Sequence, residues 1–235
     1  MELDSRKLAP MHGSMTDQIA RIRVSLIDTE PEIWRRVDVP LEASLKMLHD
    51  VIQGAMGWMD YHLWEFEAGD KRYGLPHKEW PDESLSAAKT VKLKTLLDRG
   101  VRQFLYTYDM GDNWEHLIIV EAVEDGQPGI KYPRYVEGER RAPPEDVGGT
   151  PGFENFLEAI ANPKHPEHAE ATEWHLGCYG HAFDPASFDE PTAKLRIGDN
   201  RHELHAVNGA ERFQPAGRQL PEKRNVCCWG SKIGR

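Results

Sequence analysis

The sequence has little that would place the chain in a membrane or on nucleic acid. No apolar run approaches the 18 or more residues of a membrane span, and the first fifteen residues hold no continuous apolar segment of the kind found in signal peptides. The 29 Lys and Arg are outnumbered by 39 Asp and Glu, which gives a net charge of −10. Sequence-independent nucleic-acid binding needs cations that displace counterions, so only a local basic patch would support it.

Cysteine is also scarce. The chain has Cys178 and the neighbouring pair Cys227 and Cys228, a spacing that makes a poor disulfide framework. We therefore expect reduced thiols and a cytoplasmic location. The remaining composition, 39% hydrophobic and 29% charged over 235 residues, is typical of one globular domain with tails.

The hydrophobic periodicity predicts an α+β fold. Residues 19–26 and 33–39 alternate as two strands of a hairpin. An amphipathic helix follows, with Ser44 as its N-cap and Gly57 as the glycine after its last turn. Residues 62–66 predict the next strand. We expect a mixed, mainly antiparallel sheet with helices packed chiefly on one face, opened by a β-hairpin, a helix and a strand.

Composition divides the chain into three parts. Residues 1–17 are predicted to be a disordered leader, 18–192 the folded domain, and 193–235 a flexible basic tail. Residues 196–235 contain eight Lys or Arg and four Asp or Glu, with poor periodicity. The residues predicted to be largely core are Trp34, Leu48, Ile52, Met56, Phe66, Leu105, Trp114, Ile118, Val120, Phe153, Phe156 and Leu157.

The segment between two further predicted strands, 103–108 and 117–123, is the first candidate site. It contains Asp109, Asp112, Trp114 and His116. Carboxylate and imidazole ligands suit Zn²⁺ and similar divalent ions, and a metal-bound water can act in hydrolysis. The alternative is turn chemistry, in which the aspartates cap backbone N–H groups.

Histidines elsewhere extend the candidate list. His49 and His62 lie on either side of the end of the predicted helix, so either could complete a site with the aspartates or lie hydrogen-bonded in the interior. A second set of histidines and a cysteine has spacing compatible with a metal-binding turn, or with an ordinary glycine-containing loop. Its members are His165, His168, His175, Cys178 and His181.

Four arginines in the opening hairpin could form a basic face for nucleic acid, or only a solvated side of the sheet. They are Arg21, Arg23, Arg35 and Arg36, next to Trp34. Strand alternation predicts that Arg21, Arg23 and Arg35 point to a common solvent side.

Several motifs in order carry a family resemblance. They are Pro31 to Val37, Leu48 to Trp58 with His62, Leu63 and Phe66, Tyr108 to His116, Pro143 to Gly149 with Gly152 and Phe153, and Phe183 to Pro185 with Phe188 and Asp189. Across about residues 19–190 the chain resembles the plasmid pRiA4b ORF-three-like family, whose members are also labelled insertion-element passenger or TnpR-like proteins.

The resemblance implies a small α+β domain of the kind carried by bacteria, archaea and mobile elements, and it implies no particular reaction. Where family members often have cysteines around the Pro-Pro-Glu-Asp motif, this chain has Ala142 and Val147, which disfavours a thiolate metal site there. The residues after about 191 also do not resemble the usual ending, in which a helix continues.

Three functions follow as hypotheses. The first is a non-enzymatic cytoplasmic binding or adaptor domain with a protein or nucleic-acid partner, because no complete catalytic motif is present. The second is a metal-dependent hydrolase of a phosphate ester or nucleic acid, with a divalent ion such as Zn²⁺ at Asp109, Asp112 and His116. The third, a DNA-associated accessory protein of mobile elements, depends on the resemblance alone.

Overall fold

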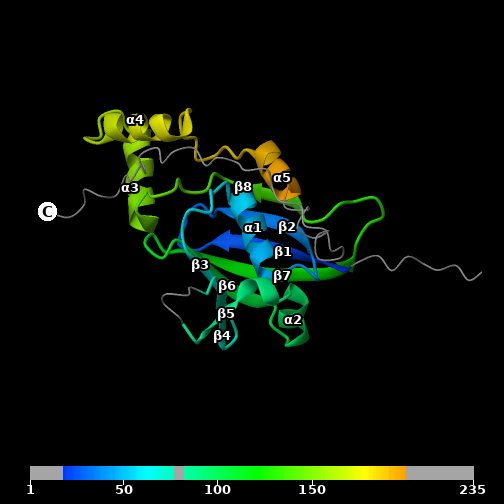
Figure 1. Ribbon diagram of the computed structural model, residues 1–235. Helices are drawn as coiled ribbons and strands as arrows, with labels where there is room; N and C mark the ends of the chain where they lie inside the picture. Colours follow the sequence, from blue (N-terminus) through cyan, green and yellow to red (C-terminus); the bar gives the residue numbers. More distant parts are fainter. Residues whose placement is uncertain (1–17, 77–81, 200–235) are drawn as a thin grey trace, which may run out of the picture.

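The computed structural model describes residues 18–76 and 82–199 (Figure 1). The predicted leader at 1–17 and the part of the predicted tail beyond residue 199, with Cys227 and Cys228, lie outside the described residues.

A single mixed sheet forms the frame of the domain. Its strands are β1 (Gln18–Leu26), β2 (Trp34–Pro40), β3 (Trp64–Ala68), β4 (Lys71–Gly74), β5 (Leu85–Ala87), β6 (Gln103–Tyr108), β7 (Trp114–Asp125) and β8 (Arg134–Glu139). They lie in the order β5-β4-β3-β6-β7-β1-β2-β8. Every neighbouring pair is antiparallel except β4 and β5, which are parallel. The predicted α+β class and mainly antiparallel sheet are confirmed.

The helices are α1 (Leu45–Met56), α2 (Leu93–Asp98), α3 (Gly149–Ala161), α4 (His168–Tyr179) and α5 (Glu190–Asp199), with a short 3-10 turn η1 (Ala88–Thr90). Local signals in the sequence set the ends of α1. The Ser44 hydroxyl accepts from the Met47 N–H at 3.1 Å, and Gly57 adopts φ +92° and donates its N–H to Gln53. A residue with a side chain would be strained at that φ.

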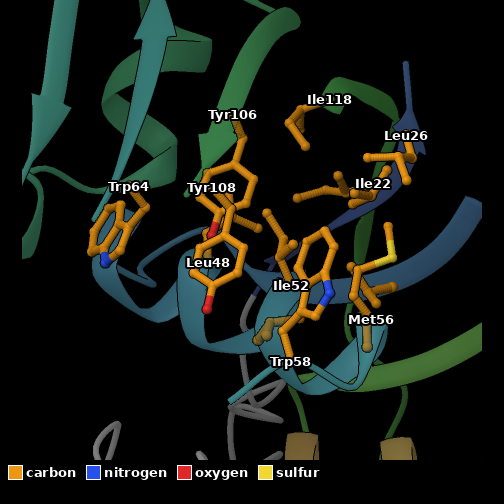
Figure 2. Close-up of a cluster of buried hydrophobic side chains, with 14 of the residues drawn as sticks. Ile22, Leu26, Leu48, Ile52, Met56, Trp58, Trp64, Tyr106, Tyr108 and Ile118 are labelled. Atoms are coloured by element: carbon orange, nitrogen blue, oxygen red, sulfur yellow. The ribbon is translucent and has the colours of Figure 1, made fainter. Parts of the chain in front are cut away.

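The core lies between α1 and the sheet. Leu48 and Ile52 of α1 pack toward Ile22 of β1 and Ile118 of β7, and the aromatic rings of Trp58 and Tyr108 close the end of this layer (Figure 2). The hairpin β1–β2, helix α1 and strand β3 follow one another as the sequence predicts, because each buries one apolar face against the same layer.

Nine of the twelve predicted core residues are buried, whereas Trp34, Leu105 and Leu157 are only partly covered. For Leu105 the strand phase was wrong: Phe104 and Tyr106 of β6 point inward, and Leu105 faces the other side. A short apolar run does not reveal its phase, because both faces carry apolar residues.

Helix α5 corrects the predicted boundary of the tail. Residues 193–199 were assigned to the flexible tail, yet they are helical, and Ala193 and Ile197 are buried. Helix α5 packs on α1, where a Cβ on Gly54 would lie only 3.3 Å from Ile197 Cγ1. Ala193 and Ile197 are four residues apart and are buried on the same side of the helix. Two apolar residues among charged neighbours are too few to predict an amphipathic helix from the sequence.

Candidate functional site

Three loops meet at one edge of the sheet and bring four titratable side chains together. They are the loop after α1, the turn between β6 and β7, and the segment between β8 and α3. His62 Nε2 lies 3.2 Å from an Asp146 carboxylate oxygen, 3.6 Å from one of Asp109, and 3.8 Å from one of Glu145. We call His62, Asp109, Glu145 and Asp146 the carboxylate–histidine cluster.

Asp109 is held by its own turn. Its backbone adopts φ +58°, and its Oδ1 accepts from the N–H groups of Gly111 at 2.8 Å and Asp112 at 3.3 Å. The Asp109 N–H donates to the Leu63 carbonyl at 2.9 Å, which ties this turn to the loop carrying His62. The other carboxylate oxygen, Oδ2, is the one that faces His62. Asp109 therefore makes the predicted kind of turn and also contributes to the cluster.

Glu145 and Asp146 come from the segment after β8. Glu145 accepts from the Met59 N–H at 2.7 Å and from the Tyr108 hydroxyl at 3.1 Å. Asp146 adopts φ +57°, an unfavourable backbone conformation for most residues with a side chain that Asp and Asn tolerate better. Burial raises the pKa of both carboxyls, and the neighbouring charges of Asp109 and Asp112 raise that of Asp146 further.

No hydrogen bond at Nε2 to a described residue explains the position of the His62 imidazole. Its Nε2 is buried and has no hydrogen-bond partner among the described residues. The ring packs edge-on against Tyr108 at 5.8 Å between centroids. Its side chain is 24% exposed, and those of Asp146 and Asp109 are 19% and 10% exposed, so the cluster is close to solvent.

His49 belongs to a different, saturated network. Its Nε2 lies 2.9 Å from Asp60 Oδ1, and its Nδ1 lies 2.8 Å from the Tyr106 hydroxyl. The carboxylate can only accept, so Nε2 carries the proton and Nδ1 accepts from Tyr106, whose oxygen in turn accepts from Gln53. The ring stacks on Trp64 at 3.9 Å, and burial lowers the pKa of His49 to about 4.

This network decides between two candidate metal sites. Across the described residues, two groups of His, Asp and Glu could hold a metal ion: His49 with Asp50 and Asp60, and His62 with Asp109 and Asp146. In the first group both imidazole nitrogens are already hydrogen-bonded, and Lys46 lies against both carboxylates. In the second group the His62 Nε2 makes no hydrogen bond within the described part of the chain, so this group is the better candidate.

The other residues predicted at the Asp loop do not join the cluster. Asp112 turns its Oδ2 to the Gly148 N–H at 3.0 Å. Trp114 and His116 point into the core, where Trp58 contacts both rings. The His116 Nδ1 must donate to the Tyr106 carbonyl at 3.2 Å, and burial lowers the pKa of His116 to about 4. Asp112 therefore has a role in the turn, and His116 is a hydrogen-bonded residue of the interior.

The second predicted histidine set does not converge as a metal-binding group among the described residues. His168 Nδ1 lies 2.8 Å from the Ala159 carbonyl, and His175 Nδ1 lies 2.9 Å from the His181 carbonyl. His165 Nδ1 accepts from the Glu167 N–H. Cys178 likewise belongs to no group that could hold a metal ion among the described residues.

The arginines of the hairpin divide between two faces. Arg35 is fully buried and donates to the carbonyls of Ala55, Trp34, Glu139 and Arg140, so the prediction that it points to solvent was wrong. Residues of β2 alternate such that Arg35 shares the inner face with Val37, and Trp34 shares the outer face with Arg36.

The outer arginines are paired with carboxylates. Arg21 binds Asp38 at 2.9 Å, Arg23 binds Glu32 at 2.8 Å, and Arg36 binds Glu121 at 2.6 Å. The guanidiniums of Arg23 and Arg36 also cover the ring of Trp34, which explains its partial exposure. These pairs leave little uncompensated positive charge on the face.

Sequence reasoning missed Glu145 and Asp146 as members of the site. It assigned their carboxylates to ordering the long loop, and Glu145 indeed orders the loop after α1 by accepting from Met59. The available signal was their place in the Pro-Pro-Glu-Asp motif, the same kind of motif that carries Asp109 and His62. Separation along the chain concealed their proximity.

The sequence profile described as plasmid pRiA4b ORF-3-like protein matches residues 18–192. The chain belongs to this family. It is 41% identical over 173 residues to "Uncharacterized protein y4hQ" from Sinorhizobium fredii (strain NBRC 101917 / NGR234), covering 74% of this chain and 87% of that protein.

A solved structure supports the fold of this family member. The crystal structure of MM3350, a protein of unknown function from Methanosarcina mazei Go1, is similar with a TM-score of 0.66 and 34% sequence identity. The similarity covers 74% of this chain and 97% of that one. Across the part of the chain that the structure describes, no helix has the length and apolar character needed to cross a membrane.

Proposed function

We propose that this family member is a cytoplasmic metal-dependent hydrolase that acts on a phosphate ester, with a divalent ion held by His62, Asp109 and Asp146. The observation that carries the proposal is the His62 Nε2, which makes no hydrogen bond to any residue that the structure describes and faces two carboxylate oxygens at 3.2 and 3.6 Å. Ligand atoms around a tetrahedral ion are separated by about 3–4 Å. A mixed imidazole and carboxylate set suits Zn²⁺ or Mn²⁺.

The charges of the cluster favour a cation. Three carboxyls surround one imidazole, and burial raises the pKa values of Glu145 and Asp146. Protonation relieves this repulsion when no cation is present, whereas a divalent ion relieves it with the carboxylates ionised. Metal binding should therefore release protons and weaken as the pH falls.

The hydrolytic chemistry follows from the number of ligands. His62, Asp109 and Asp146 would hold the ion, and three protein ligands would leave room for a water whose pKa the ion would lower, as in catalytic zinc sites. Glu145 lies beside His62 with its carboxylate at 3.8 Å and its pKa raised by burial. A carboxyl with a raised pKa is suited to take up the proton that the water loses.

A binding or adaptor role is the second candidate, and one observation favours it. Met59, Tyr61 and Leu63 from the loop after α1, and Met110 from the Asp109 turn, are large apolar residues between 42% and 70% exposed. The two loops that carry them also carry His62 and Asp109. Such exposed apolar residues are common at protein contact sites. Within the described residues the DNA-associated role has less support, because the outer arginines are already ion-paired.

Hydrolysis of p-nitrophenyl phosphate and bis-p-nitrophenyl phosphate tests the proposal. The protein is stripped with a chelator, then reloaded with Zn²⁺ or Mn²⁺. We expect activity only after reloading, and a loss of at least about 100-fold in Asp146→Asn, the size of effect seen when metal-site residues are changed. Asn also tolerates the positive φ of Asp146.

Asp112→Asn is the matched control, because the Asp112 carboxylate binds the Gly148 N–H and not the cluster. It should keep activity within about threefold of the wild type. Equal activity in the chelated and reloaded proteins would contradict the hydrolase proposal. A reloaded protein that binds metal without cleaving either ester would favour the adaptor role.

A further inference from the structure

A second hollow lies behind Glu145, between the segment 142–145 and helices α4 and α5. It is an open cavity of about 160 Å³. Its apolar wall includes Trp58, Phe183 and Phe188, and its polar groups include Tyr179, Arg141 and Arg196. Glu145 is the one member of the carboxylate–histidine cluster that also lines this cavity.

The two arginines of the cavity are not ion-paired. Within the described residues, neither Arg141 nor Arg196 has a carboxylate oxygen within 4.0 Å, in contrast to Arg21 and Arg36 on the sheet. Arg196 is partly buried and donates to the Trp58 carbonyl, and burial lowers its pKa. A partly buried guanidinium without a counterion is stabilised by an anion that enters beside it.

The acidic groups of the same wall are close enough to act on the charges of the arginines, but they make their hydrogen bonds to other groups. Glu145 accepts from the Met59 N–H and the Tyr108 hydroxyl. Asp189 lies exposed at the mouth and caps α5 by accepting from the Thr192 N–H at 3.1 Å. The Tyr179 hydroxyl accepts from the Glu145 N–H at 2.8 Å, which leaves its own proton to donate. Tyr179, Arg141 and Arg196 therefore provide donors for an anion in the cavity.

The size and the walls define the rest of the ligand. A cavity of about 150 Å³ lined by apolar side chains holds one benzene molecule. The partly exposed rings of Phe183 and Phe188 offer apolar surface for a single ring, whereas Trp58 is only 2% exposed. We propose that this cavity binds a small organic oxyanion with one aromatic ring, its charged group between Arg141 and Arg196. This site goes beyond the proposed hydrolase and requires no metal.

Calorimetric titration of the full chain with four probes tests the inference. Benzoate and phenyl phosphate carry a ring and an oxyanion, benzyl alcohol carries the ring alone, and inorganic phosphate the anion alone. We expect benzoate, phenyl phosphate or both to bind with Kd below about 5 mM, and the two partial probes at least about 10-fold more weakly, since charge-assisted hydrogen bonds and ring burial each contribute at this level. The preferred probe distinguishes a carboxylate ligand from a phosphate ligand.

Variants and metal content complete the test. Arg196→Gln and Arg141→Gln should each weaken the preferred anion at least about 10-fold, and Arg102→Gln, an exposed arginine outside the cavity, should change nothing. Circular dichroism verifies that each variant is folded, and Arg141→Gln suffices if Arg196→Gln unfolds. Absence of binding at about 10 mM, equal binding of benzyl alcohol, or unchanged binding in folded arginine variants would overturn the inference. Chelator-treated protein should bind the preferred anion as tightly as metal-loaded protein does. The anion site can therefore be confirmed or refuted even if the hydrolase proposal fails.

Discussion

Replacing Ile197 by alanine should destabilise the whole domain, although the residue lies in a stretch whose composition resembles a tail. The side chain is completely buried and contacts the bare backbone of Gly54 in α1. Truncating a buried Ile to Ala removes its burial and leaves a cavity, at a cost of about 2–5 kcal/mol. For a domain of this size each kcal/mol corresponds to about 2–4 °C in Tm. Urea denaturation followed by circular dichroism, with the slope m compared between proteins, measures the loss of unfolding free energy.

Leu195 provides the matched control on the same helix. It is 65% exposed, so Leu195→Ala should change the free energy of unfolding by no more than about 0.5 kcal/mol. If both variants lose the same amount, or Ile197→Ala loses less than about 0.5 kcal/mol, helix α5 is not part of the cooperative core. A chain ending at residue 192 should likewise be less stable than one ending at 199.

Two further predictions concern the interior and the backbone. His116 has a pKa lowered from 6.5 to about 4, so the unfolded chain takes up its proton first and stability is lost as the pH falls from about 6.5 to about 4; His116→Phe should make the urea midpoint less dependent on pH in this window, and an unchanged profile would contradict the assignment. Gly152→Ala should be strongly destabilising because its Cβ would lie 2.1 Å from the Val147 carbonyl oxygen, whereas Gly177→Ala in α4 meets no atom within 4 Å and should stabilise by up to about 1 kcal/mol. Equal thermal stability of these two glycine variants would refute the packing argument.

The sequence predicted those parts of the fold that depend on local signals. The alternation of Ile22, Val24 and Leu26 and the caps Ser44 and Gly57 act within a few residues, and each appears where it was predicted. The strand phase of Leu105 and the inward Arg35 could not be predicted in this way. The inward face of a strand depends on what the strand packs against. Arg35 is accommodated by the carbonyl of its neighbour Trp34 and by three carbonyls from distant segments.

The candidate site was only partly accessible to the same reasoning. Asp109 and His62 were both candidates, and their proximity is explained by the pairing of β3 with β6, which brings Leu63 against Asp109. Asp146 lies 37 residues after Asp109 and reaches the site through the loop before α3. No periodicity links them, so the cluster depends on tertiary contacts that one sequence does not reveal.

The metal content of the purified chain tests the central claim most directly. After chelator treatment, incubation with Zn²⁺ or Mn²⁺ and removal of unbound ion, elemental analysis should find about one ion per chain, with Kd in the micromolar range or below. Asp146→Asn should retain less than about a fifth of that ion, and Asp112→Asn should retain all of it, in line with the effect of losing one ligand. No bound ion in the wild type, or equal ion content in Asp146→Asn and the wild type, would contradict a metal site at His62, Asp109 and Asp146.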